Sequence, residues 1–268
     1  MATLMPRRPA RSDSGFTLVE MMVALTLGLM LALVVAQLFA NTRATNRSTE
    51  DSARLQENAR YAAAVIGRVV RMAGYKSDPA ASSTSIFPEF VAPALTGIDG
   101  TGLLPSDTLV VRFQGSGSPA GIADNTVLDC VGVPVAPDFA GTTKSYNNFF
   151  IATGADGRNA LWCDTDPAGL DLTKRAELVP GVDAMQVLFG EDRDGDGSAD
   201  RFLPPGTPGL NIDSVVVVRV YLLMAGSENV RVSGGSVSFT MAGQAYTYND
   251  QKIRRVVTTT ITLRNRAP

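Results

Sequence analysis

The chain contains 268 residues, with 24 lysines and arginines, 26 aspartates and glutamates, and no histidine. Without histidine it cannot form the Ser-His-Asp or Cys-His arrangements of hydrolases, and it lacks the most usual ligand of catalytic zinc. Its formal net charge of −2 gives no electrostatic reason to expect nucleic-acid binding.

The first predicted element is an apolar helix over residues 16–36, in which Glu20 is the only ionisable residue. About 21 residues at a rise of 1.5 Å are just enough to cross the hydrocarbon core of a bilayer. A carboxylate inside such a segment costs a few kcal/mol, so we expect Glu20 to have a partner. A cleavable secretory signal or a generic single-span anchor is the alternative. A cleavable signal, however, has no acid in its apolar core and needs an Ala-x-Ala-like site after it.

The residues from Gly15 to Glu20 read Gly-Phe-Thr-Leu-Val-Glu, follow a short basic leader, and resemble the type IV prepilin signature. The resemblance implies that a prepilin peptidase removes residues 1–15 by cutting after Gly15 and then methylates the new amino group of Phe16. It also implies that Glu20 pairs with the Phe16 ammonium of a neighbouring subunit during filament assembly. Such a pair is physically reasonable, because opposite charges attract strongly in low-dielectric surroundings and either charge alone is penalised there.

Residues 37–76 are expected to continue the helix as an amphipathic segment that ends near Gly74. Its apolar positions recur at three- and four-residue steps: Leu55, Ala59, Ala62, Val65, Ile66, Val69 and Met72. Such a stripe indicates packing against the protein's own sheet, with a partner interface as the second interpretation. The stretch "LQENAR…RMAGY", from Leu55 to Tyr75, resembles the PilW family of minor type IV pilins. The resemblance implies an α+β, pilin-like fold, in which the C-terminal half of the long helix packs on an antiparallel β-sheet domain.

Residues 77–268 are predicted to form one periplasmic, β-rich globular domain, long enough to bury a core of its own. It opens with a Ser-, Pro-, Gly- and Ala-rich loop, Pro79–Ser106, and Trp162 is expected in its core. Strand-like runs follow the loop at Thr108–Phe113, Val127–Cys130, Asn148–Ala152, Ala160–Cys163 and Met185–Phe189.

The only two cysteines are Cys130 and Cys163, both in the predicted periplasmic domain. An even number of cysteines in an oxidising compartment favours one disulfide, which would close a loop of about 34 residues and contribute about 3–4 kcal/mol. Two unpaired buried thiols are the alternative, since the sequence does not fix their separation in space.

Acidic residues alternate with glycines between Asp192 and Asp200, with the D-x-D-x-D-G spacing of a calcium loop. The candidate ligands are Asp192, Asp194, Asp196, Ser198 and Asp200. Calcium prefers six to eight oxygen ligands, and Gly197 would permit the sharp turn around the ion. The twelfth position is Leu203 instead of a bidentate glutamate, so the segment is not an EF-hand, and Glu191 is a candidate to complete the shell. A solvated Asp/Gly turn is the alternative.

The last third of the chain contains the most hydrophobic strand candidate, Asp213–Met224, which is expected to be central and buried on both faces. A hairpin is predicted within the Gly/Ser-rich segment Ser227–Gln244. Ile253–Asn265 alternates with period two and is rich in β-branched residues, which predicts a strand, and it resembles the closing strand of PilW-like proteins.

Together, these features predict a structural protein instead of an enzyme: a minor pilin that primes type IV pilus assembly or forms part of the pilus tip. It would cross the bacterial inner membrane once and then enter the pilus. The expected partners are the prepilin peptidase, other minor and major pilins, and a tip adhesin. A minor pseudopilin of a type II secretion system and a calcium-dependent adhesive subunit at the pilus tip are the alternatives.

Overall fold

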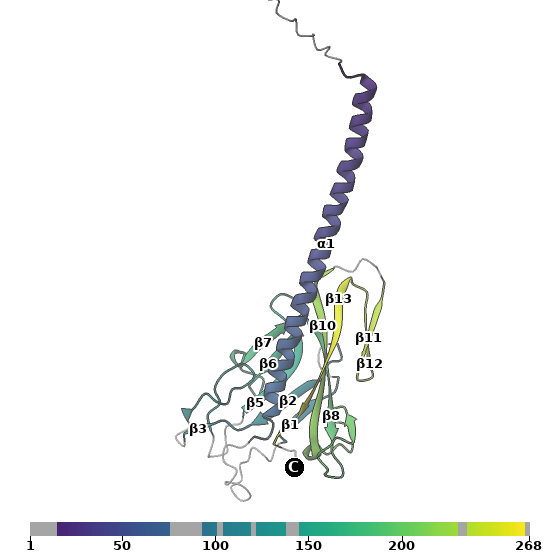
Figure 1. The fold of residues 1–268 in the computed structure, drawn as a ribbon. Coiled ribbons are helices and arrows are strands. Elements are labelled where there is room, and N and C mark those ends of the chain that lie inside the picture. Colours follow the sequence, from purple (N-terminus) through teal and green to yellow (C-terminus); the bar gives the residue numbers. More distant parts are fainter. Residues whose placement is uncertain are drawn as a thin grey trace, which may run out of the picture. The chain divides into compact units, whose positions relative to one another are not determined.

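The computed structural model describes residues 15–75, 93–100, 104–118, 122–137, 145–229 and 235–265 (Figure 1). The chain divides into two compact units, Met1–Arg47 and Ser48–Pro268. Residues 1–14 of the expected leader and most of the expected loop Pro79–Ser106 lie outside the described residues.

One helix, α1 (Leu18–Arg71), accounts for the described part of the first unit and continues into the second. An 18-residue window within α1 has a mean hydropathy of 2.5, and none of that window is buried. This window is long and apolar enough to cross a membrane, as the sequence predicts. The helix begins two residues after Phe16 and ends four residues before Tyr75, close to the expected limits.

In the second unit, the C-terminal part of α1 buries the apolar stripe that its sequence predicts, including Leu55, Ala62, Ile66 and Val69. Packing against the protein's own sheets is therefore the correct interpretation of that stripe. Just after the helix, Gly74 adopts a φ of 72° and donates its N–H to the carbonyl of Arg112 at 3.0 Å. This left-handed conformation favours glycine, which explains why the helix ends here.

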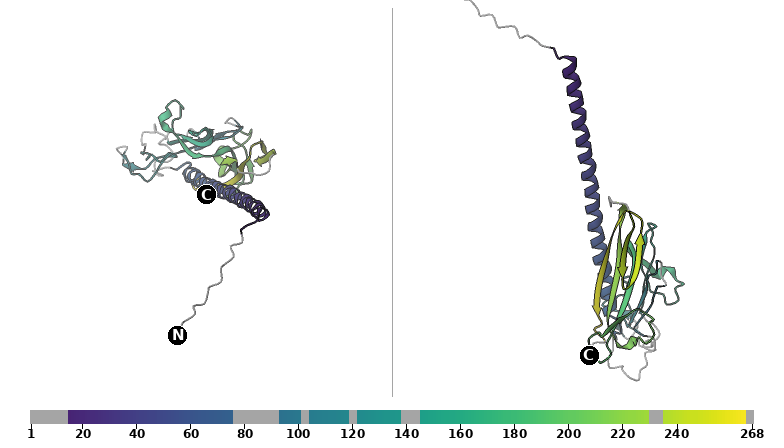
Figure 2. Two further views of the ribbon diagram at one scale, coloured as in Figure 1. Left: turned by 90° about the horizontal axis from the view of Figure 1, so that it is seen from above. Right: turned by 90° about the vertical axis from the view of Figure 1, so that its right-hand side faces the viewer.

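Two larger antiparallel sheets form the body of the second unit (Figures 1 and 2). The five-stranded sheet has the order β1 (Leu95–Ile98), β2 (Thr108–Phe113), β5 (Ser145–Thr153), β6 (Asn159–Asp164) and β7 (Arg175–Pro180). The four-stranded sheet has the order β13 (Lys252–Thr262), β10 (Val215–Asn229), β8 (Val182–Glu191) and β9 (Arg201–Leu203). Two small pairs complete the strands: β3 (Gly117–Ser118) with β4 (Ile122–Ala123), and β11 (Val237–Met241) with β12 (Gln244–Tyr248).

The two sheets are joined where the start of β2 meets β8. The Asp107 N–H donates to the Met185 carbonyl at 2.8 Å, and the Asp107 carboxylate accepts the Val187 N–H at 2.7 Å. The Asp107 side chain is fully buried, and this burial raises its pKa to about 6. The buried carboxylate of Asp107 holds the two sheets in one arrangement, because without it the backbone N–H groups that it accepts would be buried without a partner.

Strand β10 lies between β13 and β8 and is covered on both faces, as predicted for Asp213–Met224. Val218, Val220 and Leu222 pack into the core that includes the stripe of α1. Leu223 points to the opposite face, where it packs with Met241 of β11 and Tyr246 of β12. A strand buried on both faces needs the near-continuous apolar run that the sequence shows here.

Several sequence predictions need correction. Val127–Cys130 is not a strand, because it forms only an isolated bridge between Leu128 and Pro134. The hairpin is β11–β12: its first strand lies within the predicted segment Ser227–Gln244, but its second strand runs beyond that segment to Tyr248, and the segment's first residues, Ser227–Asn229, belong to β10. Trp162 is half-buried, not part of the core, and its indole N–H has no partner among the described residues.

Candidate assembly and metal sites

The N-terminus of α1 is closed by a reciprocal pair of hydrogen bonds between Thr17 and Glu20. The Glu20 N–H donates to Oγ1 of Thr17 at 3.2 Å, and Oε2 of Glu20 accepts the Thr17 N–H at 2.8 Å and its hydroxyl at 2.9 Å. This is a capping box, in which a threonine precedes the helix and an acid occupies its third position. The N-terminus of α1 is therefore capped by hydrogen bonds within one subunit.

The capping box occupies only one oxygen of the carboxylate. Within the described residues, Oε1 of Glu20 accepts no hydrogen bond. Phe16, which precedes the capping threonine, is 86% exposed. The predicted assembly acid therefore has one fixed oxygen and one available oxygen, and it lies at the N-terminal end of α1, where none of the 18-residue apolar window is buried by the described residues.

Thr17 contacts the predicted assembly acid, and the sequence analysis assigned it no role. The sequence contains the signal for this contact, because Ser/Thr-x-x-Glu directly before an apolar run is the sequence pattern of a capping box. The structure thus gives Thr17 the role of orienting Glu20.

The two cysteines, Cys130 and Cys163, form a disulfide, and both are buried in the core of the second unit. Cys163 belongs to β6, whereas Cys130 lies in the irregular segment between β4 and β5. The side-chain oxygen of the buried Asn147 accepts the Cys130 N–H at 2.7 Å. The disulfide therefore fixes an irregular segment to β6 of the five-stranded sheet.

The aspartate-rich loop between β8 and β9 folds around the carboxylate of Asp192. Its Oδ1 accepts the Gly195 N–H at 2.7 Å, and its Oδ2 accepts the Gly197 N–H at 2.8 Å. Gly197 has a φ of 85°, the left-handed region that the predicted sharp turn requires. The N–H of Gly197 holds the pKa of Asp192 below its usual range, so the carboxylate is ionised at neutral pH.

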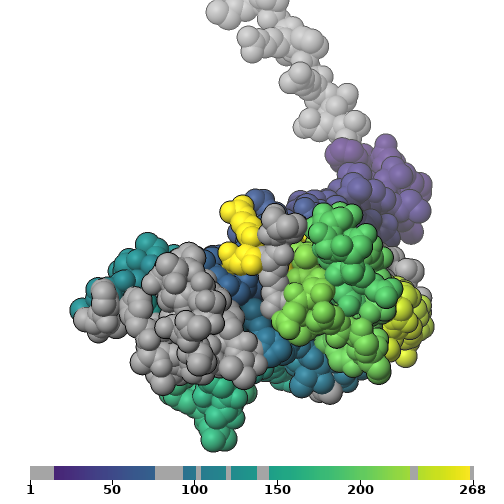
Figure 3. All heavy atoms as spheres, turned by 90° about the horizontal axis from the view of Figure 1, so that it is seen from below, coloured from purple at the N-terminus to yellow at the C-terminus, as the bar shows by residue number. Residues whose placement is uncertain are grey.

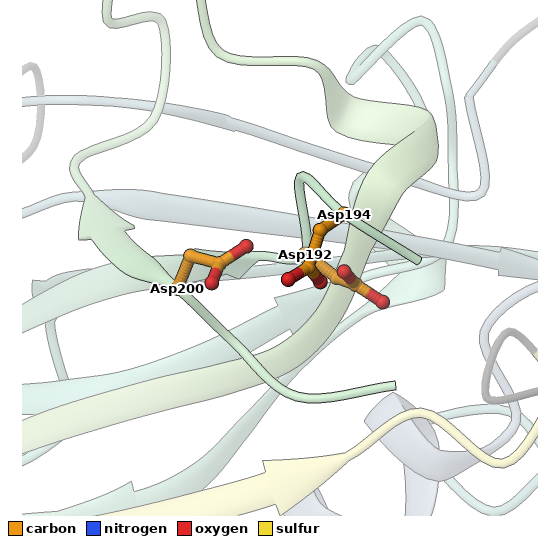
Figure 4. Close-up of side chains that lie close together, drawn as sticks. All are labelled: Asp192, Asp194 and Asp200. Atoms are coloured by element: carbon orange, nitrogen blue, oxygen red, sulfur yellow. The ribbon is translucent and has the colours of Figure 1, made fainter. Parts of the chain in front are cut away.

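The structure brings three of the five candidate metal ligands together. Carboxylate oxygens of Asp192, Asp194 and Asp200 lie within 4.8 Å of one another (Figure 4). Asp192 is buried and the other two are exposed, and the green region around residue 200 lies at the surface in Figure 3. Asp196 and Ser198 are outside this cluster, with the Ser198 N–H donating to Asp196 at 2.7 Å.

Glu191 does not complete the shell in this structure. Its Oε2 lies 2.6 Å from Nε of Arg201, and its Oε1 accepts the Asn211 N–H at 3.1 Å. The Arg201 side chain holds the pKa of Glu191 below its usual range. Both oxygens therefore stabilise the base of the loop, and further ligands of an ion would have to be loop carbonyls or water.

Comparisons with known proteins match two separate parts of the chain. Residues 10–36 match the family described as the prokaryotic N-terminal methylation motif, and residues 148–265 match the type IV pilus-assembly protein W family. No curated protein matches the chain. Among solved structures, the type IV-like pilin TTHA1219 from Thermus thermophilus is 15% identical and covers 80% of this chain and 100% of its own. Its TM-score of 0.43 is too low to establish a shared fold.

The two family matches do not overlap and together cover more than half of the chain. The first includes the motif from Gly15 to Glu20 and the apolar first third of α1, and the second includes β6, the disulfide residue Cys163, and the strands of the four-stranded sheet. The C-terminal part of the chain is thus similar to the type IV pilus-assembly protein W family, and the two matches together support a membrane-anchored minor pilin of type IV pilus assembly.

Proposed function

We propose that this minor pilin is held in the inner membrane by residues 16–36 and then enters the pilus as part of the priming or tip complex. The observation that carries the proposal is the state of Glu20. One oxygen is held by Thr17, and the other is available on an uncovered apolar helix. A carboxylate in this position is satisfied when a positively charged group approaches it inside the filament.

The partner of Glu20 in this proposal is the amino group of a neighbouring pilin, after a prepilin peptidase has cut behind Gly15. The same cut in this chain would place its own ammonium on Phe16, next to the threonine that orients Glu20. Each subunit then carries both halves of the contact, and pairing the halves fixes the register between helices. Breaking a buried ion pair by removing one partner costs about 3–5 kcal/mol, which is large enough to control assembly.

A hollow on the apolar helix supports close approach of another helix. It is a shallow, open surface lined by Met21, Leu25, Gly28 and their neighbours. Gly28 is exposed, and it has no side chain to keep a second helix away from the backbone of α1. Small residues at such positions let transmembrane helices pack closely.

The test compares incorporation of Glu20→Ala and Glu50→Ala variants into pili. Glu50 is a matched control, because it lies on the same helix in an exposed ion pair with Arg54. Pili are sheared from cells, and the ratio of this chain to the major pilin is measured by quantitative mass spectrometry. We expect at least about a 100-fold loss for Glu20→Ala, corresponding to about 3 kcal/mol, and no change for Glu50→Ala. Equal recovery of the two variants would overturn the proposed role of Glu20.

We also propose that the loop from Asp192 to Asp200 binds calcium in this pilin. The clustering of Asp192, Asp194 and Asp200 supports this, because three carboxylates so close together repel one another unless a cation neutralises them. Titration calorimetry of the full chain in detergent should detect calcium-dependent heat. The heat should disappear in the Asp194→Asn/Asp200→Asn variant and persist in Glu228→Ala, which changes an exposed acid elsewhere. Absence of heat in the unmutated chain would reject calcium binding.

A further inference from the structure

The outer edge of β13 is unusual among the sheet edges of this protein. The edge strands of the two larger sheets are β1 with four residues, β7 with six, β9 with three and β13 with eleven. Long edges are normally protected by charged residues, proline or bulges, because their free backbone groups pair with other chains. Between Val256 and Thr262, β13 has no charged residue and no proline, and its residues are all valine, isoleucine or threonine.

The register shows which backbone groups of β13 are free. The Leu263 N–H donates to the Val216 carbonyl at 2.8 Å, and the same register continues with Ile261 opposite Val218. In an antiparallel ladder, hydrogen-bonded pairs alternate with pairs whose N–H and C=O groups point away from each other. The outward-pointing groups therefore belong to Val256, Thr258, Thr260 and Thr262, and they have no backbone partner among the described residues.

A groove lies beside this edge, between β13 and α1. It has a volume of about 300 Å³, and its apolar lining includes Leu55, Ala59 and Val257. Arg60 and Arg255 also line the groove, and both are exposed. Neither arginine has a carboxylate within 4 Å in the described part of the chain. Within the described residues, the groove thus offers an apolar floor with two cations that have no carboxylate partner.

We propose that β13 receives an extended strand from another pilin subunit, whose acidic side chain pairs with Arg60 and Arg255. Backbone hydrogen bonds to the free edge supply affinity, and side chains in an adjacent pocket supply specificity, as in other cases of strand addition. The positive charge of the groove selects an acidic segment with an apolar residue two strand positions away, on the same face of the added strand. This inference rests on the proposed function, because the added strand comes from a subunit of the same filament.

The first experiment measures amide hydrogen exchange of the full chain in membranes and in pili enriched through a tag on this chain. The outward amides of Val256, Thr258 and Thr260 should exchange at least about tenfold more slowly in pili. The amides of Val257 and Thr259 are the internal control, because β10 protects them in both states. Equal exchange of the outward amides in both states would overturn strand addition.

The second experiment uses matched variants at the edge and in the groove. Thr260→Pro removes an outward N–H without removing a bond to β10, and Thr260→Ala keeps that N–H. Recovery in pili should fall at least about tenfold for Thr260→Pro and for Arg60→Glu/Arg255→Glu, and stay unchanged for Thr260→Ala. The arginine variant changes only exposed side chains, so it remains informative if the proline variant does not fold.

The two proposals fail in different ways. If the unmutated chain is absent from pili, the proposed function is wrong and this inference is wrong with it. If the chain is present in pili and Arg60→Glu/Arg255→Glu is recovered as well as the unmutated chain, strand addition at β13 is wrong and the proposed function stands.

Discussion

Replacing both cysteines by alanine should lower the thermal stability of the second unit substantially. Cys130 and Cys163 are separated by 33 positions, and both are buried. In the chain-entropy model, a disulfide that closes a loop of this length contributes about 3.7 kcal/mol at 25 °C. For a domain of about 220 residues, each kcal/mol shifts the melting temperature by about 2–4 °C, so we expect a decrease of about 7–15 °C.

The assay is thermal unfolding of the full chain in detergent, followed by the fluorescence of Trp162. This residue is the only tryptophan, and it lies on β6 beside Cys163. The single variant Cys130→Ala is the control for packing, because it removes the disulfide and leaves the second sulfur in place. It should lose most of the stability that the double variant loses.

A decrease of less than about 3 °C in the double variant would refute this reasoning. It would mean that the irregular segment around Cys130 is held by its other contacts. The bond between the Cys130 N–H and Asn147 is the contact that would then carry the stability.

Two further predictions concern the core of the second unit. Because the pKa of Asp107 is raised to about 6, its folded form holds a proton that the unfolded chain releases above about pH 4. The free energy of unfolding should therefore fall by up to about 3 kcal/mol between about pH 4 and pH 6. Asp107→Asn should remove this slope in denaturant titrations, and an unchanged slope would contradict the assignment. Ile66→Ala removes a fully buried side chain of α1 and should cost about 2–5 kcal/mol in the same titrations. Glu57→Ala, on the exposed side of α1, should change stability by less than about 0.5 kcal/mol, and equal effects of the two would contradict the packing described here.

Strands with a strong pattern of their own were predictable from sequence. Thr108–Phe113 was predicted with the bounds of β2, and the apolar run around Val218 was correctly predicted as central because both of its faces are buried. By contrast, β1 lies in a region predicted as a loop, and it is a strand because it pairs with β2. Strand β9 has only three residues and forms because it pairs with β8. Such strands depend on tertiary contacts that local propensity does not encode.

The candidate sites were likewise predictable only in the parts that depend on local sequence. Spacing within the aspartate-rich loop predicted the cluster of Asp192, Asp194 and Asp200, but it did not show that Asp196 lies outside this cluster. The sequence favoured a disulfide between Cys130 and Cys163 over two unpaired thiols but did not establish it. The distance between the two residues depends on where an irregular segment lies against β6. The free edge of β13 was not predicted, because a sequence does not show which strand ends a sheet.

The contact between Glu20 and a neighbouring amino group can be measured directly by zero-length crosslinking. A carbodiimide joins a carboxylate and an amine only when they touch, so intact pili are treated and digested, and the peptide containing Glu20 is identified by mass spectrometry. We predict that this peptide is joined to the N-terminal residue of another pilin, and that subunits extracted from the membrane yield no such product. If Glu20 in pili is never joined to another subunit's N-terminus while other pilin carboxylates react, the proposed assembly contact is wrong.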